Sequence, residues 1–371
     1  MFWDDIIQPD DIRWTEALQR FPRHDFHHLP GYVALESARR GGRARAYVLQ
    51  SDQGTFMVPF VESAVPLTLQ PLGLSPCDAL APYGYAGPLV NAGGNEQERN
   101  KFVALALARL VEYLRCRGNC AVLLRFHPLI LPPLAPFQNL GRLVFHGETV
   151  CQDLHQTPEQ LWSETRHGFR NPINRLERQG FQFELDFAGR HLDEFMRIYH
   201  DTMQRVGADS QYFFSREYVT AFRNALGAGF VLAHIRSPSG EIVSSGIFTV
   251  CSGIVQYHLS GNKLGGQGSD GSKLLLHGIR RWAQAQGFDF FHLGGGVGGR
   301  DDSLFNFKSG FASGRANFCT WRMIVDEPVY HRLCRTWETL NRTVADSAEG
   351  FFPAYRKMLP PPMAQGQERC A

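Results

Sequence analysis

The first half of the chain combines short apolar runs, typical of strands, with a segment in which apolar residues recur every three or four positions, typical of a helix. Two of the runs flank a Gly-containing turn and predict a β-hairpin. A stretch rich in Pro and Gly, an amphipathic helix and a short strand follow. These elements are expected, in that order, at 46–50, 55–62, 66–94, 96–116 and 121–126.

The second half repeats this order of elements. A hairpin and a third strand lead into a glycine-rich loop, a helix that ends at a glycine, and a further strand. These elements are expected at 230–236, 242–251, 254–259, 261–271, 272–286 and 288–293. The two halves share little sequence, but the shared order predicts an internal duplication.

The segment between the two units is predicted to be helical. A capping box with Pro at the first helical position begins a helix at 157–160, and further helices are expected over 192–206 and 215–227. Helices that feed an antiparallel sheet, followed by a helix and a strand, indicate an α+β class. We expect a first domain at 1–150, a second at 151–330, and a C-terminal helix and loosely ordered tail at 331–371.

Composition and charge exclude several classes of protein. Of the 371 residues, 43% are hydrophobic and 20% charged, which is ordinary for a folded chain of two domains. The net charge of +2 leaves no whole-chain footprint for nucleic acid, so any RNA contact would use a local patch. No apolar run approaches the roughly 20 residues that span a bilayer. The acidic N-terminus is unlike a secretory signal, so we expect a cytoplasmic protein without integral membrane contact.

Cysteine and histidine spacing does not suggest a metal site. The eight cysteines form no C-x-x-C pair and are expected to be reduced. His24, His27 and His28 have a spacing near that of metal ligands, but no second ligand pair stands nearby in the sequence. We therefore expect no metal.

Two glycine-rich segments invite comparison with nucleotide-binding loops. Gly294, Gly296 and Gly299 match G-x-G-x-x-G, but the strand-like run 304–308 follows where a dinucleotide site needs a helix. These glycines are better explained as a sharp turn beside a cleft. The loop 265–271 leads directly into a helix, whose free N–H groups would bind phosphate. It could equally be a flexible surface loop with Ser269 or Asp270 as the N-cap.

Two further segments carry candidate charges. The basic segment 166–178 suits a phosphate backbone or a diphosphate, although a solvated helix face explains it too. Lys308 lies in an aromatic run, where apolar neighbours lower the pKa of a lysine and make its charge costly without an anionic partner. It either reaches the surface or serves a substrate carbonyl or phosphate.

Several segments together resemble the Fem-like family of bacterial transferases. They are 81–88 (APYGYAGP), 170–180 (RNPINRLERQG), 195–199 (FMRIY) with Met203, 257–262 (YHLSGN), Trp282-Ala283 with Gly287, 291–295 (FHLGG) and 307–311 (FKSGF). Their order is more specific than any one of them, and the resemblance covers residues 25–326. It implies two tandem acetyltransferase-like (GNAT) domains, each a mixed sheet flanked by helices. The long charged heptad segment of a coiled-coil arm, which some members carry, is missing from the sequence.

The resemblance also implies a function. Such enzymes transfer an aminoacyl group from charged tRNA to an amine, often on a peptidoglycan precursor or a small peptide or natural-product intermediate. An acyl-coenzyme A-dependent N-acyltransferase and a non-enzymatic binding module are the alternatives. The Lys of the Phe-Lys signature belongs to the catalytic centre, which assigns that role to Lys308 and Phe307. No tightly bound cofactor is expected, because aminoacyl-tRNA or acyl-coenzyme A acts as co-substrate.

No Cys-His or Ser-His pair points to a covalent intermediate, so we expect direct acyl transfer. Lys308 and backbone amides would stabilise the oxyanion, and Asp302 or a substrate carboxylate or phosphate would accept the proton. The candidate substrate-binding residues are Tyr83, Tyr85, Tyr212, Tyr257, Arg170 and Arg175. The candidate donor phosphate-binding residues are Gly268, Ser269 and Gly271.

Overall fold

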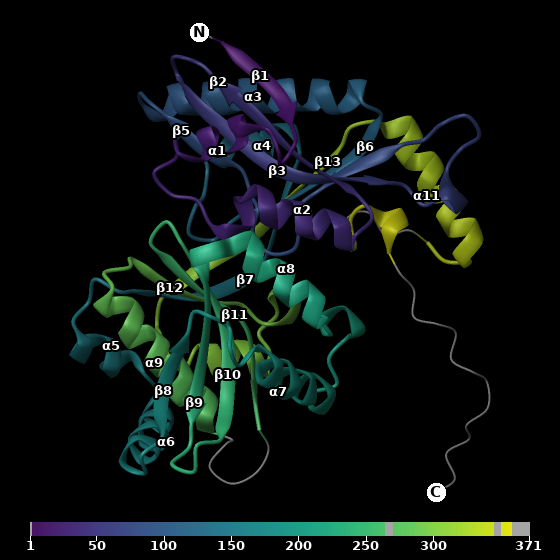
Figure 1. Ribbon diagram of the computed structural model, residues 1–371. Helices are drawn as coiled ribbons and strands as arrows, with labels where there is room; N and C mark the ends of the chain where they lie inside the picture. The colour runs from purple at the N-terminus through teal and green to yellow at the C-terminus, as the bar shows by residue number, and fades with distance from the viewer. Residues whose placement is uncertain (1, 264–269, 345–349, 358–371) are drawn as a thin grey trace, which may run out of the picture.

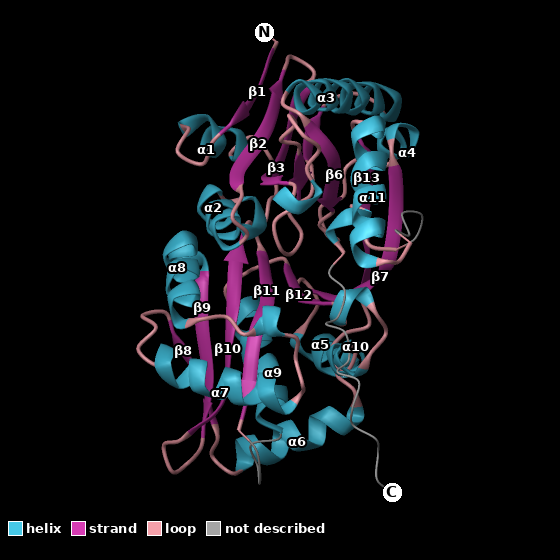
Figure 2. Cartoon of the chain, turned by 90° about the vertical axis from the view of Figure 1, so that its right-hand side faces the viewer, coloured by secondary structure: helices cyan, strands magenta, loops and turns pink. Residues whose placement is uncertain are grey.

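The structure, a computed structural model, describes residues 2–263, 270–344 and 350–357. Its thirteen strands form one mixed sheet that runs the length of the molecule, with helices on both faces (Figures 1 and 2). The strands are β1 (Trp3–Ile7), β2 (Arg43–Gln50), β3 (Gly54–Ala64), β4 (Cys77–Leu80), β5 (Leu89–Ala92), β6 (Asn119–Arg125), β7 (Arg142–Asp153), β8 (Gln182–Asp186), β9 (Phe230–Arg236), β10 (Ile242–Cys251), β11 (Ile254–Asn262), β12 (Phe290–Gly294) and β13 (Arg315–Ile324).

The helices cover the sheet in layers whose apolar faces form the core. They are α1 (Ile12–Leu18), α2 (Pro30–Arg39), α3 (Glu96–Cys116), α4 (Ala135–Leu140), α5 (Pro158–Glu164), α6 (His167–Arg178), α7 (Leu192–Arg205), α8 (Arg216–Leu226), α9 (Gly271–Ala285), α10 (Ser303–Lys308) and α11 (Glu327–Asn341). In the second half, α6 and α9 cover one face of the sheet, and α7 and α8 cover the other. Helix α2 of the first half packs against α8 of the second. No helix in the described ranges is long and apolar enough to cross a membrane.

Both halves contain the same arrangement of strands. In the first, β2, β3 and β4 are antiparallel neighbours, and β4 then pairs parallel with β6 after the helix α3. In the second, β9, β10 and β11 are antiparallel neighbours, and β11 pairs parallel with β12 after the helix α9. This shared topology confirms the duplication that the order of elements predicts.

The two halves exchange their last strands. Strand β7 follows β6 in the chain but pairs with β12 of the second half, and β13 follows β12 but pairs with β6 of the first. Strands β7 and β13 also pair with each other, from Arg142 opposite Arg322 to Val150 opposite Arg315. The expected break at residue 150 lies inside β7. The division into 1–150, 151–330 and 331–371 stays a prediction.

Most elements match the sequence analysis, and two expectations were wrong. The run 304–308 is not a strand, because the Asp302 side chain accepts a hydrogen bond from the Phe305 N–H and begins the short helix α10. The part of the tail at 350–357 is not loose. Phe352 and Tyr355 are buried against α11, and Tyr355 donates a hydrogen bond to buried Asp78. Residues 358–371 lie outside the described residues.

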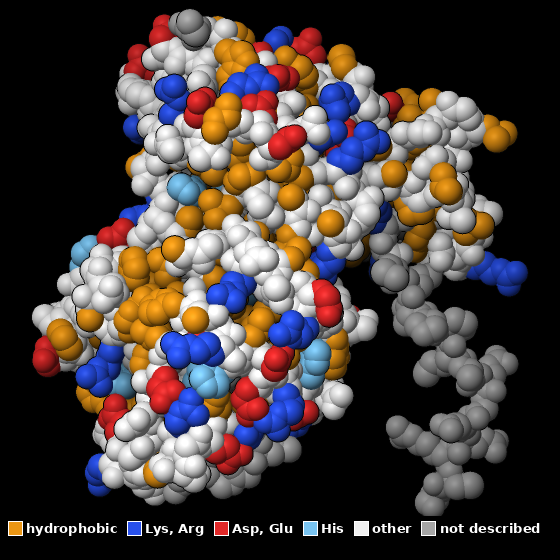
Figure 3. All heavy atoms as spheres, viewed as in Figure 1, with side chains coloured by type: hydrophobic (Ala, Val, Ile, Leu, Met, Phe, Trp, Pro, Cys, Tyr) orange, Lys and Arg blue, Asp and Glu red, His pale blue; other side chains and the backbone are white. Residues whose placement is uncertain are grey.

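The surface carries both signs of charge. On the face shown in Figure 3, basic and acidic side chains are interspersed over both halves. This distribution agrees with the balanced composition.

Trp321 tests whether the strand exchange couples the halves. It lies on β13, is fully buried, and donates a hydrogen bond from Nε1 to the Phe137 carbonyl at 2.8 Å. We expect Trp321→Ala to lower the free energy of unfolding by about 3–5 kcal/mol. Because β13 holds β7, and β7 holds β12, urea unfolding should shift equally for both halves. Circular dichroism and fluorescence from Trp162 and Trp282 in the second half measure this.

The matched control is Trp3→Ala on the edge strand β1, which is half-buried and should cost less. A second-half transition that does not move in Trp321→Ala would contradict the coupling.

Candidate active site

Strands β11 and β12 of the second half run side by side over only three residue pairs, from Ile254 and Phe290 to Gln256 and His292. Next to this stretch, β11 carries a bulge at His258, where its register with β10 shifts. Strand β11 then stays with β10, whereas Gly294 of β12 pairs with Val150 of β7. The two strands therefore diverge beyond these three residue pairs.

Lys308 lies at this divergence. The short helix α10 places its side chain inside the protein, where the residue is 8% exposed. Its Nζ donates a hydrogen bond to the Gly295 carbonyl at 2.6 Å and lies 5.6 Å from the centre of the Tyr257 ring. Burial lowers the pKa of Lys308 to about 8, and the charge of Asp302 opposes that shift. A substrate oxygen that carries negative charge would stabilise this ammonium.

Asp302 orients α10. One carboxylate oxygen accepts the Phe305 N–H at 2.9 Å and the other accepts the Val297 N–H at 2.8 Å. Burial raises the pKa of Asp302, but these hydrogen bonds outweigh it and lower the pKa overall. A carboxylate held in this way is a weak base. The aromatic partner in the signature, Phe307, packs 5.6 Å from the rings of Phe169 and Phe311 in the second-half core.

Tyr85 reaches the divergence from the first half. It follows β4, and a Cβ built on Gly294 would lie 3.8 Å from its hydroxyl and 3.3 Å from Lys308 Nζ. Burial raises the pKa of Tyr85. Two residues predicted from distant motifs, Tyr85 and Lys308, therefore flank the same glycine.

Tyr83 lies in the same loop and is fixed through its backbone. The Tyr32 hydroxyl donates to its carbonyl at 2.9 Å, and its N–H donates to buried Glu36 at 3.3 Å. Burial raises the pKa of Tyr83 to about 12, and the phenol of Tyr212 adds to the shift. The carbonyl of Tyr212 accepts a hydrogen bond from Tyr199. The first-half loop and the second-half helices thus bring tyrosines together.

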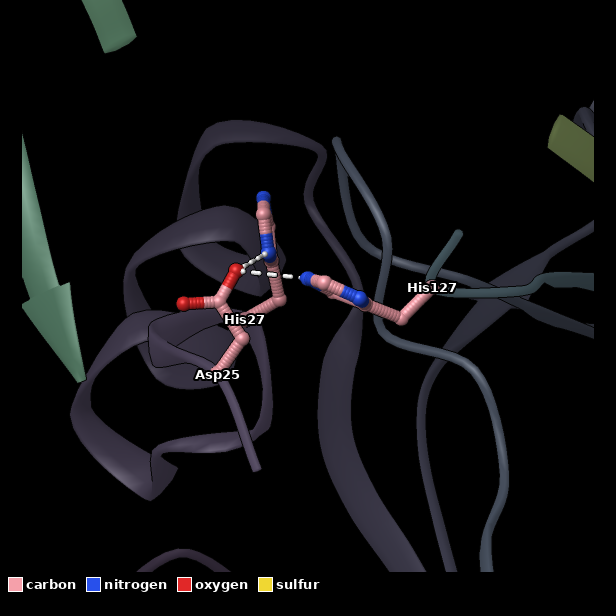
Figure 4. Close-up of side chains that lie close together, drawn as sticks. All are labelled: Asp25, His27 and His127. Carbon is pink, nitrogen blue, oxygen red and sulfur yellow. Dashed lines mark hydrogen bonds and ion pairs between the residues drawn. The ribbon is translucent and has the colours of Figure 1, made fainter. Parts of the chain in front are cut away.

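A buried polar network of Asp25, His27 and His127 (Figure 4) packs against this loop through His27. Asp25 Oδ2 lies 2.9 Å from His27 Nδ1 and 3.1 Å from His127 Nε2. Because His127 Nδ1 accepts the Leu129 N–H, its proton is on Nε2, which donates to Asp25. Although burial raises the pKa of Asp25, the two imidazole donors hold it well below its usual range. The carboxylate is therefore ionised and fully paired.

The ring of Tyr85 contacts three imidazoles in edge-on or tilted geometry. Its centre is 5.4 Å from that of His292, 5.5 Å from His27 and 5.9 Å from His127. Nearby, Arg125 donates from Nε to the Gly84 carbonyl at 2.7 Å. Sequence reasoning missed Asp25, Arg125 and His127 as part of this region. The available signal was the position of Arg125 at the end of an apolar strand and of His127 just after it.

The predicted donor side lies at the start of α9. Asp270 would repel an anion here, but its charge is neutralised by Arg175 and Lys273, each 2.6 Å away. The Asp270 side chain makes no capping bond to α9. Gly271 begins the helix, and Gly268 and Ser269 lie outside the described residues.

The start of α3 and the contacts of Arg170 both bear on the predicted donor-binding region. In the first half, α3 begins instead with a complete capping box of Asn95 and Glu98, which puts negative charge where a phosphate would bind. Arg170, also predicted to bind substrate, uses its guanidinium for the carbonyls of Thr165 at 2.6 Å and Ser163 at 2.5 Å. Arg175 thus lies at the start of α9, and Arg170 holds the turn between α5 and α6.

Gly84 tests the packing of the tyrosine loop. Its φ is +93°, and a Cβ there would lie 2.0 Å from His27 Nε2. The control Gly73 has φ +76° with nothing within 4 Å of its Cβ position. We expect Gly73→Ala to cost about 1 kcal/mol for its backbone conformation. Gly84→Ala should cost about 1–3 kcal/mol more from overpacking. Urea unfolding measures both, and equal losses would show that His27 does not constrain the loop.

Comparison with known proteins places this site in a family context. Residues 163–308 match the model of the acetyltransferase (GNAT) domain. No curated protein matches the sequence significantly.

Solved structures share the fold across most of the chain. The crystal structure of FemX covers 89% of this chain and 99% of its own, with 13% identity and a TM-score of 0.65. L-PGS from Bacillus licheniformis covers 88% and 96%, with 17% identity and a TM-score of 0.51. The C-terminal domain of a putative lysylphosphatidylglycerol synthetase from Agrobacterium fabrum covers 88% and 95%, with 16% identity and a TM-score of 0.51. Residues 163–308 therefore match a GNAT acetyltransferase domain, which supports a transferase, and the chain shares its overall fold with FemX and L-PGS.

Proposed function

We propose that the protein transfers an amino acid from charged tRNA to an amine and forms an amide bond. The acceptor would be a small peptide, a natural-product intermediate or a peptidoglycan precursor. The observation that carries the proposal is the buried Lys308 between the diverging strands of the second half, next to Tyr85 of the first. We place the reaction in the cytoplasm, where charged tRNA is made.

The chemistry requires one bond to form and one to break. The neutral acceptor nitrogen attacks the carbonyl carbon of the aminoacyl ester, and the carbon–oxygen bond to the ribose then breaks. Negative charge develops on the carbonyl oxygen, where Lys308 Nζ would donate a hydrogen bond. Because Gly295 occupies one of the three N–H donors of the ammonium, the others are available to the substrate.

The acceptor would lie against the tyrosines where the two halves meet. Tyr83, Tyr85, Tyr212 and Tyr257 offer aromatic faces and hydroxyls from both halves. Both oxygens of Asp302 already accept backbone hydrogen bonds. We therefore assign Asp302 the role of positioning α10. A carboxylate or phosphate of the substrate would accept the proton from the amine. The leaving ribose oxygen takes up a proton in the same reaction.

The donor would approach the start of α9. A helix N-terminus favours a phosphate group, and Arg175 and Lys273 add positive charge at this one. The alternative donor is acyl-coenzyme A, whose diphosphate would suit the same place. The match of 163–308 to a GNAT acetyltransferase domain favours this second candidate.

Lys308→Met tests the proposed catalytic centre. We expect an intact fold and a turnover lower by about 10²–10³-fold, because one preorganised contact to the oxyanion is lost. Lys308→Arg should recover part of the rate, since a planar guanidinium does not replace a compact ammonium. Single-turnover kinetics with circular dichroism measure this. The control Lys101→Met changes an exposed lysine on α3 and should leave turnover unchanged.

The pH profile separates two roles of Lys308. The pKa of about 8 lies below the usual 10.5, so the ammonium prevails below pH 8 and is lost above it. If the ammonium stabilises the oxyanion, activity falls as pH rises through about 8, and Lys308→Arg removes that fall. Activity that rises through this pH because of Lys308 would identify it as a base instead. Near-normal turnover in a folded Lys308→Met protein would refute both roles.

Salt dependence tests the donor. With charged tRNA, the affinity should fall steeply as salt rises, because each phosphate contact releases counterions. Arg175→Ala should raise the donor KM more than it lowers turnover, since Asp270 loses one of its two cations. The control is Arg178→Ala, an exposed arginine on the same helix whose Nε bonds the Asn174 carbonyl. Activity with acyl-coenzyme A alone that is insensitive to ribonuclease would decide for the alternative.

A further inference from the structure

A second polar cluster lies at the edge of the second half, on the strands β8 and β9. Asp186 ends β8, His191 precedes α7, and His234 lies in β9. Asp186 Oδ2 is 3.3 Å from His191 Nδ1 and 3.7 Å from His234 Nε2. These three ligand atoms lie within 4.8 Å of one another.

His234 presents an orphaned nitrogen to this cluster. Its side chain is 1% exposed, and Nε2 makes no hydrogen bond to the described residues. Its other nitrogen, Nδ1, lies 2.8 Å from Ser245 Oγ. When Nδ1 donates to that hydroxyl, the lone pair on Nε2 points to Asp186. A hydrogen bond from the other ring nitrogen to a neighbouring acceptor fixes the tautomer of metal-binding histidines in this way.

Asp186 Oδ2 accepts the His191 backbone N–H at 2.8 Å and is within hydrogen-bond reach of His191 Nδ1, but its spacing from His234 Nε2 fits an ion better than a hydrogen bond. Two ligands about 2.0–2.1 Å from a tetrahedral zinc ion lie about 3.3 Å apart. The 3.3 and 3.7 Å separations at Asp186 agree with this value, and the longer one exceeds hydrogen-bond length.

The cluster of Asp25, His27 and His127, where the two halves meet, has the spacing of hydrogen bonds. Asp25 lies at 2.9 and 3.1 Å from its two histidines, which are hydrogen-bond distances. The Leu129 N–H points at His127 Nδ1, so Nε2 of that ring carries a proton and cannot bind a metal. Both clusters contain one aspartate and two histidines, but only the one at β8 offers a free nitrogen.

We infer that Asp186, His191 and His234 form a binding site for a divalent transition-metal ion of the zinc class. Two imidazoles and one carboxylate suit zinc rather than calcium or magnesium, which take oxygen ligands. The His191 side chain is 41% exposed, so the ion enters from solvent and water completes its coordination. The ion would tie the edge strand β8 and the start of α7 to β9.

The test uses the untagged full-length protein after removal of metals with a chelator. Zinc chloride is titrated by calorimetry, and cobalt(II) is followed by the visible absorption of tetrahedral cobalt. We expect one ion per chain and a rise in melting temperature on zinc addition. His191→Ala should weaken zinc binding by about 10-fold or more and abolish the thermal shift, without loss of the fold, because this side chain is partly exposed.

The matched control is His155→Ala. His155 is also a surface histidine beside carboxylates, 2.8 Å from Asp153 and 3.3 Å from Asp289. Its loss should leave the stoichiometry and the affinity unchanged. Failure of the wild-type protein to bind zinc saturably, equal binding by His191→Ala, or loss of binding in His155→Ala would each overturn the inference. None of these outcomes bears on the proposed aminoacyl transfer.

Discussion

The pairing of β7 with β13 is the constraint on which the rest of the structure depends. Each half has a parallel strand pair that needs an antiparallel neighbour on its far side, and the other half supplies it. The unpaired edge that each half would expose alone is thereby covered. Because β7 pairs with Gly294, the first half also sets where β12 turns away from β11. The position of Gly295, the hydrogen-bond acceptor of Lys308, follows from that turn.

Polar groups are buried where the two halves meet, and the carboxylates of Asp25 and Glu36 have hydrogen-bond partners there. A buried polar group is costly unless it is hydrogen-bonded, so such a network favours one arrangement of the loops that it holds. Glu36 illustrates this, because its carboxylate accepts the Tyr218 hydroxyl at 2.9 Å and the Tyr83 N–H at 3.3 Å. One side chain on α2 therefore connects α8 with the tyrosine loop. The network of Asp25 supports the same loop from the other side.

The two halves share a topology but differ in their chemistry. Helices α3 and α9 are equivalent in the repeat, yet α3 is closed at its start by Asn95 and Glu98. At the start of α9 the Asp270 side chain makes no capping bond, and its carboxylate is neutralised by two cations. Among the described residues, the second half therefore combines a helix start that carries two cations with a buried lysine. The first half contributes the tyrosine loop and one strand, so the site belongs to both halves.

The sequence alone determined the local elements. Helix α3 was predicted to the residue, as were β9 and β10, because the repeat of apolar positions and the flanking turns depend on neighbouring residues only. The order of motifs was also enough to single out Tyr83, Tyr85, Tyr257 and Lys308. The tertiary structure decided which of these residues meet, and it decided the strand exchange, because apolar alternation does not specify a partner strand. Aromatic residues at 304–308 suggested a strand, but the Asp302 cap made a helix and turned Lys308 inward. The pairing of Asp25 with His127 spans 102 positions and leaves no local pattern, so only the folded chain could reveal it.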